Sequence, residues 1–105
     1  MKVCFIGGLW DGIYNDFEFE GDQKNLPQIY KVENKEKTHW KQHELIKQGK
    51  SIDEIKVEEK YILMMLRRNR TFKYFYIFNE LDRPEIQNLS AENWNLSDVF
   101  GYDFD

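Results

Sequence analysis

The most restrictive feature of this sequence is the run Thr71 to Phe78, in which almost every residue is aromatic or β-branched. Strands favour such residues, and successive side chains of a strand point to opposite faces of a sheet. The run therefore predicts a central strand. One face would carry Phe72, Tyr74, Tyr76 and Phe78, and the other Lys73, Phe75 and Ile77.

A partner for this strand precedes it directly. Tyr61 to Leu66 is a continuous apolar run of strand length, and a short basic segment around Asn69 separates the two runs. Strands that are adjacent in the sequence commonly pair across a tight turn. We therefore predict a hairpin of residues 60–67 with residues 71–78.

The N-terminal third predicts a second hairpin. Val3 to Ile6 has the composition of a strand, and Gly7-Gly8 ends it. Asp11-Gly12 is a turn dipeptide, because glycine tolerates the positive φ that such turns require. Residues 13–20 then form a second strand, because their second half alternates between aromatic and acidic side chains, which indicates a half-buried strand. Another extended segment is predicted over residues 28–32.

Two helices are predicted in the middle of the chain. Asn34 is a suitable N-cap for a helix that runs to about Gln48 and ends at Gly49. Ser51-Ile52-Asp53-Glu54 matches a capping box, which predicts a short helix over residues 52–57. A continuous helix over residues 52–67 stays open as an alternative.

The tail after residue 81 is acidic and rich in turn residues. We expect short helical turns beginning at Ser90 and at Ser97, and an edge strand at the C-terminus. Together these elements predict an α+β fold, an antiparallel sheet of four to five strands with one or two helices on its side. A length of 105 residues fits one domain, residues 1–105.

Composition narrows the class of protein. The 17 aromatic residues argue against disorder, because disordered chains are poor in such residues. The single cysteine, Cys4, cannot form an internal disulfide, which favours a reducing compartment. The N-terminal apolar run is too short for a signal peptide, and no run approaches the roughly 20 residues of a membrane helix. We therefore expect a cytoplasmic protein that binds no membrane.

The sequence offers little catalytic chemistry. His39 and His43 have the spacing of a metal-binding pair on a helix, but Lys47 stands where a zinc-protease pattern needs a second histidine. Cys4 lies inside an apolar strand, where a thiol is usually buried and unreactive. We therefore expect no metal, no cofactor and no enzymatic activity.

A basic cluster is the main candidate for binding. Arginine and lysine side chains beside aromatic rings bind phosphates and bases well. They can equally keep a turn solvated or pair with the acidic tail. The formal net charge of −4 argues against duplex DNA, whose binding scales with the phosphates neutralised. The candidate binding residues are Arg67, Arg68, Arg70, Lys73, Tyr74 and Tyr76.

The segment Phe5 to Gly12 resembles the opening of a set of short bacteriophage and prophage proteins. Those proteins begin with a strand and a Gly-Gly-x-x-Asp-Gly turn, have a tyrosine near position 30, and end in a tyrosine-rich strand. Their turn commonly contains Pro-Leu where this chain has Leu9-Trp10, and the helical middle at 35–57 is a further departure. The matching residues are Gly7, Gly8, Asp11, Gly12 and Tyr30, and the tyrosines at 61 and 74–76 fall where later strands would lie.

The resemblance implies a phage origin and a bacterial host cell. Small phage accessory proteins often bind and disable a host factor. The leading expectation is therefore a non-catalytic counter-defence protein that binds a host immune macromolecule such as a CRISPR effector. The alternatives are a protein that sequesters a nucleotide immune signal and a structural or assembly protein of the phage particle. A second copy of the chain stays open as a further partner, and the turn glycines are expected to shape the turn rather than to contact a ligand.

Overall fold

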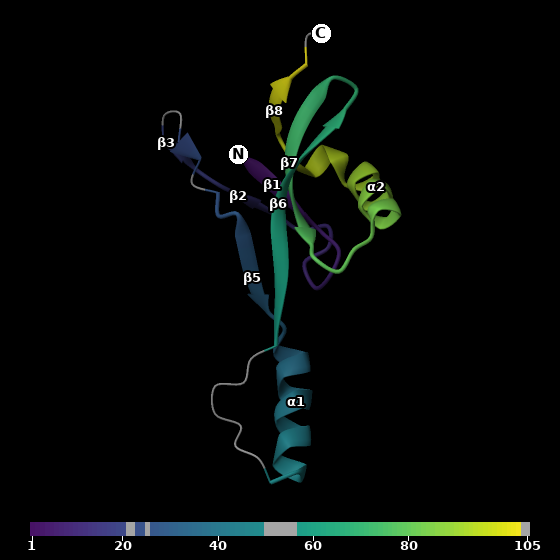
Figure 1. Ribbon diagram of the computed structural model, residues 1–105. Helices are drawn as coiled ribbons and strands as arrows, with labels where there is room; N and C mark the ends of the chain where they lie inside the picture. The colour runs from purple at the N-terminus through teal and green to yellow at the C-terminus, as the bar shows by residue number, and fades with distance from the viewer. Residues whose placement is uncertain (21–22, 25, 50–56, 104–105) are drawn as a thin grey trace.

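The computed structural model describes residues 1–20, 23–24, 26–49 and 57–103. These residues form two α-helices and eight strands. Figure 1 shows how they are arranged. In chain order these are β1 (Lys2–Ile6), β2 (Tyr14–Asp16), β3 (Phe19–Glu20), β4 (Gln23–Lys24), β5 (Ile29–Glu33), α1 (Lys35–Lys47), β6 (Glu58–Arg68), β7 (Thr71–Phe78), α2 (Arg83–Glu92) and β8 (Val99–Tyr102). A 3₁₀ turn, Trp94–Leu96, follows α2.

The fold is α+β, as predicted, but its main sheet is mixed rather than antiparallel throughout. The strand order is β2-β1-β7-β6-β5, with β8 also paired to β7. β1 runs parallel to β7, whereas the other pairs in this sheet are antiparallel. The prediction of an antiparallel sheet of four to five strands is therefore wrong on both points, because the main sheet is mixed and has six strands. The error in strand direction lies at β1, which pairs with a strand about 70 residues away as well as with its hairpin neighbour β2.

The predicted hairpin of 60–67 with 71–78 is confirmed as β6 and β7. Their register runs from Tyr61 opposite Phe78 to Arg68 opposite Thr71. The two turn residues, Asn69 and Arg70, have φ values of 50° and 64°. Positive φ at both central positions is typical of the two-residue turn whose twist matches that of the flanking strands. This pairing excludes a helix over residues 58–67.

β7 is central, with β6 along one edge and two strands sharing the other. β8 pairs with residues 71–73 of β7, and β1 pairs with residues 75–77. Ser97 fills the junction between β1 and β8. Its hydroxyl accepts a hydrogen bond from Cys4 N at 2.8 Å and donates one to Tyr74 O at 2.9 Å. The start and the end of the described chain are thus joined at this serine, and next to it Lys2 N donates to Asp98 Oδ2 at 2.8 Å.

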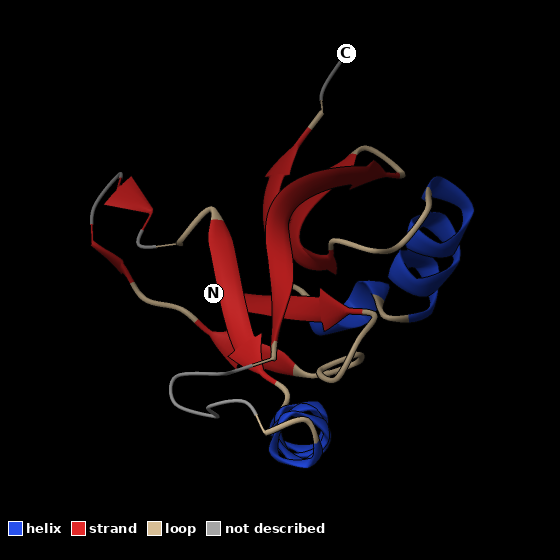
Figure 2. Ribbon diagram, turned by 60° about the horizontal axis from the view of Figure 1, so that its bottom comes forward, coloured by secondary structure: helices blue, strands red, loops and turns tan. Residues whose placement is uncertain are grey.

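The alternation of β7 places its side chains in two different clusters, as predicted. On one face Tyr74 and Tyr76 pack with Phe5 and Tyr61, and Trp10, Phe17 and Tyr30 join them from the edges. On the other face, Phe75 and Ile77 pack with Cys4 and Ile6 beneath α2. Figure 2 shows α2 beside the sheet, and Figure 1 shows α1 extending away from it.

The glycine-rich turn after β1 is built around two side chains of β6. The Tyr61 hydroxyl donates to Gly7 O at 2.7 Å and accepts from Trp10 N at 3.0 Å. The buried Glu59 carboxylate accepts from Leu9 N at 2.7 Å. Asp11 closes the turn from within, because its carboxylate accepts from Gly7 N at 2.7 Å. These contacts give the turn residues a structural role.

The predicted helix over 34–48 is confirmed as α1, and Asn34 caps it by accepting a hydrogen bond from Lys37 N at 3.0 Å. Two further hydrogen bonds fix its first turn. Thr38 Oγ1 accepts from Val57 N at 2.8 Å, and Asn34 N donates to Val57 O at 2.8 Å. Beyond that turn the helix extends away from the sheet, as Figure 1 shows. The predicted helix over 52–57 falls almost entirely outside the described residues.

The C-terminal part differs most from the sequence-based expectation. Helix α2 was not predicted, and Ser90 lies within it rather than starting a helical turn. The helical turn predicted at Ser97 is wrong, because Val99–Tyr102 form the strand β8. The expected edge strand near the C-terminus is confirmed by β8. Among the described residues, no helix is long and apolar enough to cross a membrane.

Candidate functional site

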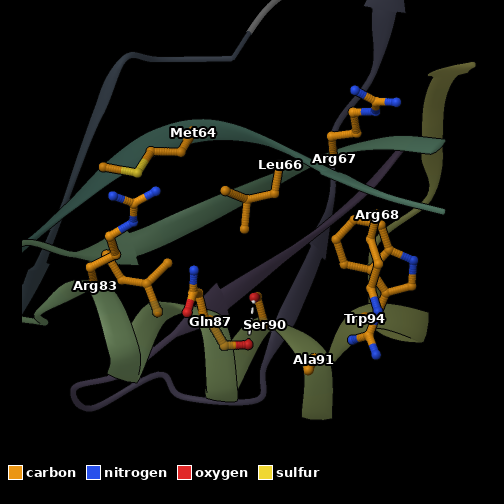
Figure 3. Close-up of a pocket in the computed structure, with 10 residues that line it drawn as sticks. Met64, Leu66, Arg67, Arg68, Arg83, Gln87, Ser90, Ala91 and Trp94 are labelled. Carbon is orange, nitrogen blue, oxygen red and sulfur yellow. Dashed lines mark hydrogen bonds between the residues drawn. The ribbon is translucent and has the colours of Figure 1, made fainter. Parts of the chain in front are cut away.

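A groove of about 540 Å³ lies between β6 and α2. Met64 and Leu66 line it from β6, and Ile86 and Trp94 line it from α2 and the 3₁₀ turn; all four side chains are half-buried. Figure 3 shows the residues that form it. Its remaining lining residues are Arg67, Arg68, Arg83, Gln87, Ser90 and Ala91. The lining contains three arginines and no acidic residue, although the chain as a whole is acidic.

Helix α2 forms one wall because its two ends and one face are fixed. Asp82 caps it by accepting from Glu85 N at 2.9 Å, and the Glu85 side chain accepts from Asp82 N at 3.4 Å, which completes a capping box. Ile86 and Leu89 pack on the cluster around Phe75. This packing directs Arg83 and Gln87 toward the groove.

The arginines of the groove are not equivalent. Arg67 pairs with Asp103 at 2.7 Å, and in Figure 3 its side chain points away from α2. Arg68 and Arg83 are exposed and lie at opposite ends of the groove. Neither takes part in an ion pair with another described residue. The positive charge available inside the groove therefore comes from Arg68 and Arg83.

Trp94 forms an aromatic wall at the Arg68 end. Its ring centroid is 5.5 Å from that of Phe75, with the planes tilted by 30°. The Lys73 ammonium lies 5.1 Å from the Trp94 ring centroid and donates to Trp94 O at 2.8 Å. Burial lowers the pKa of Lys73, and the nearby Asp98 opposes that shift. These contacts hold the indole in one position while it lines the groove.

The structure brings only two of the six predicted binding residues to this groove, Arg67 and Arg68. Arg70 is exposed in the β6–β7 turn and does not line it. Lys73 is buried beneath Trp94. Tyr74 and Tyr76 point to the opposite face of the sheet, where the Tyr76 hydroxyl donates to Pro27 O at 2.7 Å.

Sequence reasoning missed Arg83 and Trp94 as groove residues. Arg83 lies between Asp82 and Pro84, and the sequence Asp-Arg-Pro-Glu carries the signal of a helix start. Recognising that helix would have placed Arg83, Gln87 and Ser90 on one face at helical spacing. The approach of this face to β6 is a tertiary contact that no local pattern contains.

Helix α1 forms a second exposed surface. The Trp40 side chain is 62% exposed, and its ring centroid lies 6.5 Å from that of His43. The helix carries four lysines and two glutamates, whereas the rest of the chain has 11 basic and 17 acidic residues. A basic helix with an exposed tryptophan thus extends from an acidic body.

None of the described groups with catalytic chemistry lines the groove. Burial, with a smaller effect of Asp11, raises the pKa of the Cys4 thiol to about 12. His39 and His43 are exposed on α1. Within the described part of the chain, no three His, Cys, Asp or Glu side chains are grouped so that they could hold a metal ion.

Comparisons were made with protein-family models, with curated proteins and with solved structures. None of the three finds a match to this chain.

Proposed function

We propose that the protein is a non-catalytic counter-defence protein of phage type, which binds and inhibits a host immune macromolecule. The observation that supports this proposal is α1, which extends from the body and exposes Trp40. Tryptophan is among the residues that most often dominate the energy of protein–protein interfaces. A tryptophan on an extending helix is well placed to insert into a partner.

The charge distribution indicates the chemistry of that partner. Lys41 follows Trp40 directly in α1, Lys47 lies two turns beyond Trp40, and the helix has a surplus of lysine. Opposite charges across an interface steer association and fix its orientation. The target surface is therefore an acidic patch of a host protein with an apolar pocket for Trp40, and the acidic body of this protein would turn away from it.

Plating assays test this function. The protein is expressed in bacterial strains that each carry one defence system, a CRISPR system first, and phage plating is measured with and without expression. We expect plating to recover in one strain, and the protein to bind the purified effector of that system in titration calorimetry. Unchanged plating in every strain would contradict the counter-defence function.

A matched pair of variants tests the role of α1. Trp40→Ala with Lys41→Glu removes the exposed ring and reverses one charge, and we expect it to abolish the recovery of plating. The control, Ile29→Ala with Lys31→Glu, makes the same kinds of change at two exposed residues of β5, away from α1. Equal activity of the two variants would exclude α1 as the binding surface.

A further inference from the structure

We infer that the groove between β6 and α2 is a nucleotide-binding site, in which the base stacks on Trp94 and the phosphate binds Arg83. This site lies apart from α1, so the inference goes beyond the proposed function and does not depend on it. The groove volume of about 540 Å³ falls in the usual range for small-molecule sites. A site of this size accommodates a nucleotide.

The charge of the groove selects an anionic ligand. Arg68 and Arg83 are its free cations within the described chain, and no acidic side chain lines it. Guanidinium groups bind phosphate oxygens through paired, charge-assisted hydrogen bonds. The amide groups at the start of α2 are not the phosphate site, because Asp82 already caps them. The phosphate contact therefore belongs to the Arg83 side chain.

The aromatic wall selects a planar ring. Trp94 is held by Phe75 and Lys73, so little ordering is needed when a base stacks on it. Stacking of bases on aromatic side chains is a general mode of nucleotide recognition. Arg68, at the same end of the groove in Figure 3, adds a planar cation beside the base.

The spacing between the two ends suits a nucleoside phosphate. Arg83 and Ala91 are eight residues apart on α2, which is about 12 Å along a helix axis. Gln87 lies between these ends, and its exposed amide can both donate and accept hydrogen bonds. A base at Trp94, a sugar near Gln87 and a phosphate at Arg83 follow this order along the groove.

The geometry favours a nucleotide over an acidic peptide. A peptide would need partners for its backbone amides and carbonyls, and only Gln87 and Ser90 supply uncharged polar side chains in the groove. Ser90 Oγ already donates to Gln87 O at 3.1 Å, marked by the dashed line in Figure 3. The planar wall of Trp94 at one end and Arg83 at the other match a base with a phosphate more closely than they match a peptide.

Titration calorimetry of the full-length protein tests the site. The probes are adenosine and guanosine, their mono- and triphosphates, a cyclic dinucleotide, inorganic phosphate and a short phosphotyrosine peptide. We expect at least one nucleotide to bind, and its parent nucleoside and inorganic phosphate to bind at least about tenfold more weakly. No binding of any nucleotide at millimolar concentration overturns the inference. Equal binding of nucleotide and phosphate, or tighter binding of the peptide, overturns it as well.

Two variants localise the binding. Arg83→Glu should lower the affinity for the nucleotide by at least about tenfold, because it replaces the partner of the phosphate by a repelling charge. Arg70→Glu makes the same change in the β6–β7 turn, outside the groove, and should bind as the unaltered protein does. Both residues are exposed, so both variants should fold, which their melting temperatures would confirm. Equal loss in the two variants would overturn the assignment to the groove.

Tryptophan fluorescence gives a second readout. Stacking should quench the emission of Trp94, and the quenching should disappear in Trp94→Phe while Trp10 and Trp40 still emit. Quenching that persists in this variant would place the base elsewhere and overturn the proposed geometry. Plating assays with Arg83→Glu separate this inference from the proposed function, because that variant leaves α1 intact.

Discussion

The Tyr61 hydroxyl donates a hydrogen bond to the carbonyl oxygen of Gly7 at 2.7 Å, across 54 positions of the sequence. Together with Glu59 it fixes the turn that follows β1 against β6. Within this turn, Gly8 leaves no room for a side chain. A Cβ atom on Gly8 would lie 2.7 Å from both the Tyr61 hydroxyl and a Glu59 carboxylate oxygen.

This contact predicts that Gly8→Ala destabilises the fold by about 2–4 kcal/mol, from overpacking and from a φ of +64°. Gly49→Ala is the matched control. Gly49 has a φ of +72° but no atom within 4 Å of an added Cβ, so this substitution should lower the free energy of unfolding by only about 1 kcal/mol. Urea denaturation measures both. Equal losses would show that the clash with Tyr61 and Glu59 is relieved without cost.

Ser97→Ala should cost about 2–3 kcal/mol of unfolding free energy. The change removes the acceptor for Cys4 N and the donor to Tyr74 O, and it leaves buried polar backbone groups without this partner. The control is Ser90→Ala. The Ser90 hydroxyl donates to Gln87 O in its own helix, so its loss should lower the free energy of unfolding by only about 0.5–1 kcal/mol. If the two variants melt alike, Ser97 does not hold the strand junction.

Tyr76 combines a buried ring with a partly buried hydrogen bond from its hydroxyl. Tyr76→Phe should cost about 1–2 kcal/mol, because Pro27 O loses its donor. Tyr76→Ala should cost about 3–5 kcal/mol, because its ring stacks on Phe5 at 4.9 Å. Tyr14→Phe, at an exposed ring, should change stability little. A stable and active Tyr76→Ala variant would contradict the central place of β7 in the core.

Because the Cys4 thiol is buried, we predict that the protein loses stability at alkaline pH. Its pKa rises from 9.0 to about 12 on folding, mainly because the thiol is buried. Between these values the unfolded chain loses the proton and the folded chain keeps it, so the unfolding free energy falls as the pH rises above about 9. Below pH 9 the thiol is protonated in both states, so its contribution to the free energy of unfolding is fully present.

Chemical denaturation at pH 8 and at pH 10 measures this loss, and Cys4→Ala should reduce it. Tyr61 and Tyr76 also have raised pKa values from burial, so part of the loss above pH 10 should persist in the variant. The two proteins are compared by how steeply the free energy of unfolding falls with pH, because the variant also leaves a small cavity that lowers stability at every pH. An unchanged slope in Cys4→Ala would assign the alkaline loss to the tyrosines alone.

The sequence predicted the elements whose signals are local. The alternation of residues 71–78 and the tight turn around Asn69 predicted the β6–β7 hairpin. Asn34 and Gly49 predicted the two ends of α1. Each of these signals lies within a few residues of the structure that it specifies, so no tertiary information was needed.

The mixed sheet and the groove depend on contacts that are distant in sequence. β1 has the same composition whether it pairs only with β2 or also with β7, so the parallel pair was not predictable from Val3 to Ile6. Alternation in β7 separated Tyr74 and Tyr76 from Lys73, but it did not indicate which face is covered. The tyrosines proved to be core residues because Phe5 and Tyr61 pack on them.

The position of β1 beside β7 has a consequence for the order of folding. During synthesis, β1 leaves the ribosome long before residues 75–77, its parallel partners, have been made. The β6–β7 hairpin closes a loop of two residues, whereas the β1–β7 pair closes one of about 70 residues at a larger entropic cost. Pairs of high sequence separation form slowly. We therefore expect the hairpin to form first and β1 to add last, so that ribosome-bound chains truncated before residue 78 expose the apolar side chains of β1 to chaperones.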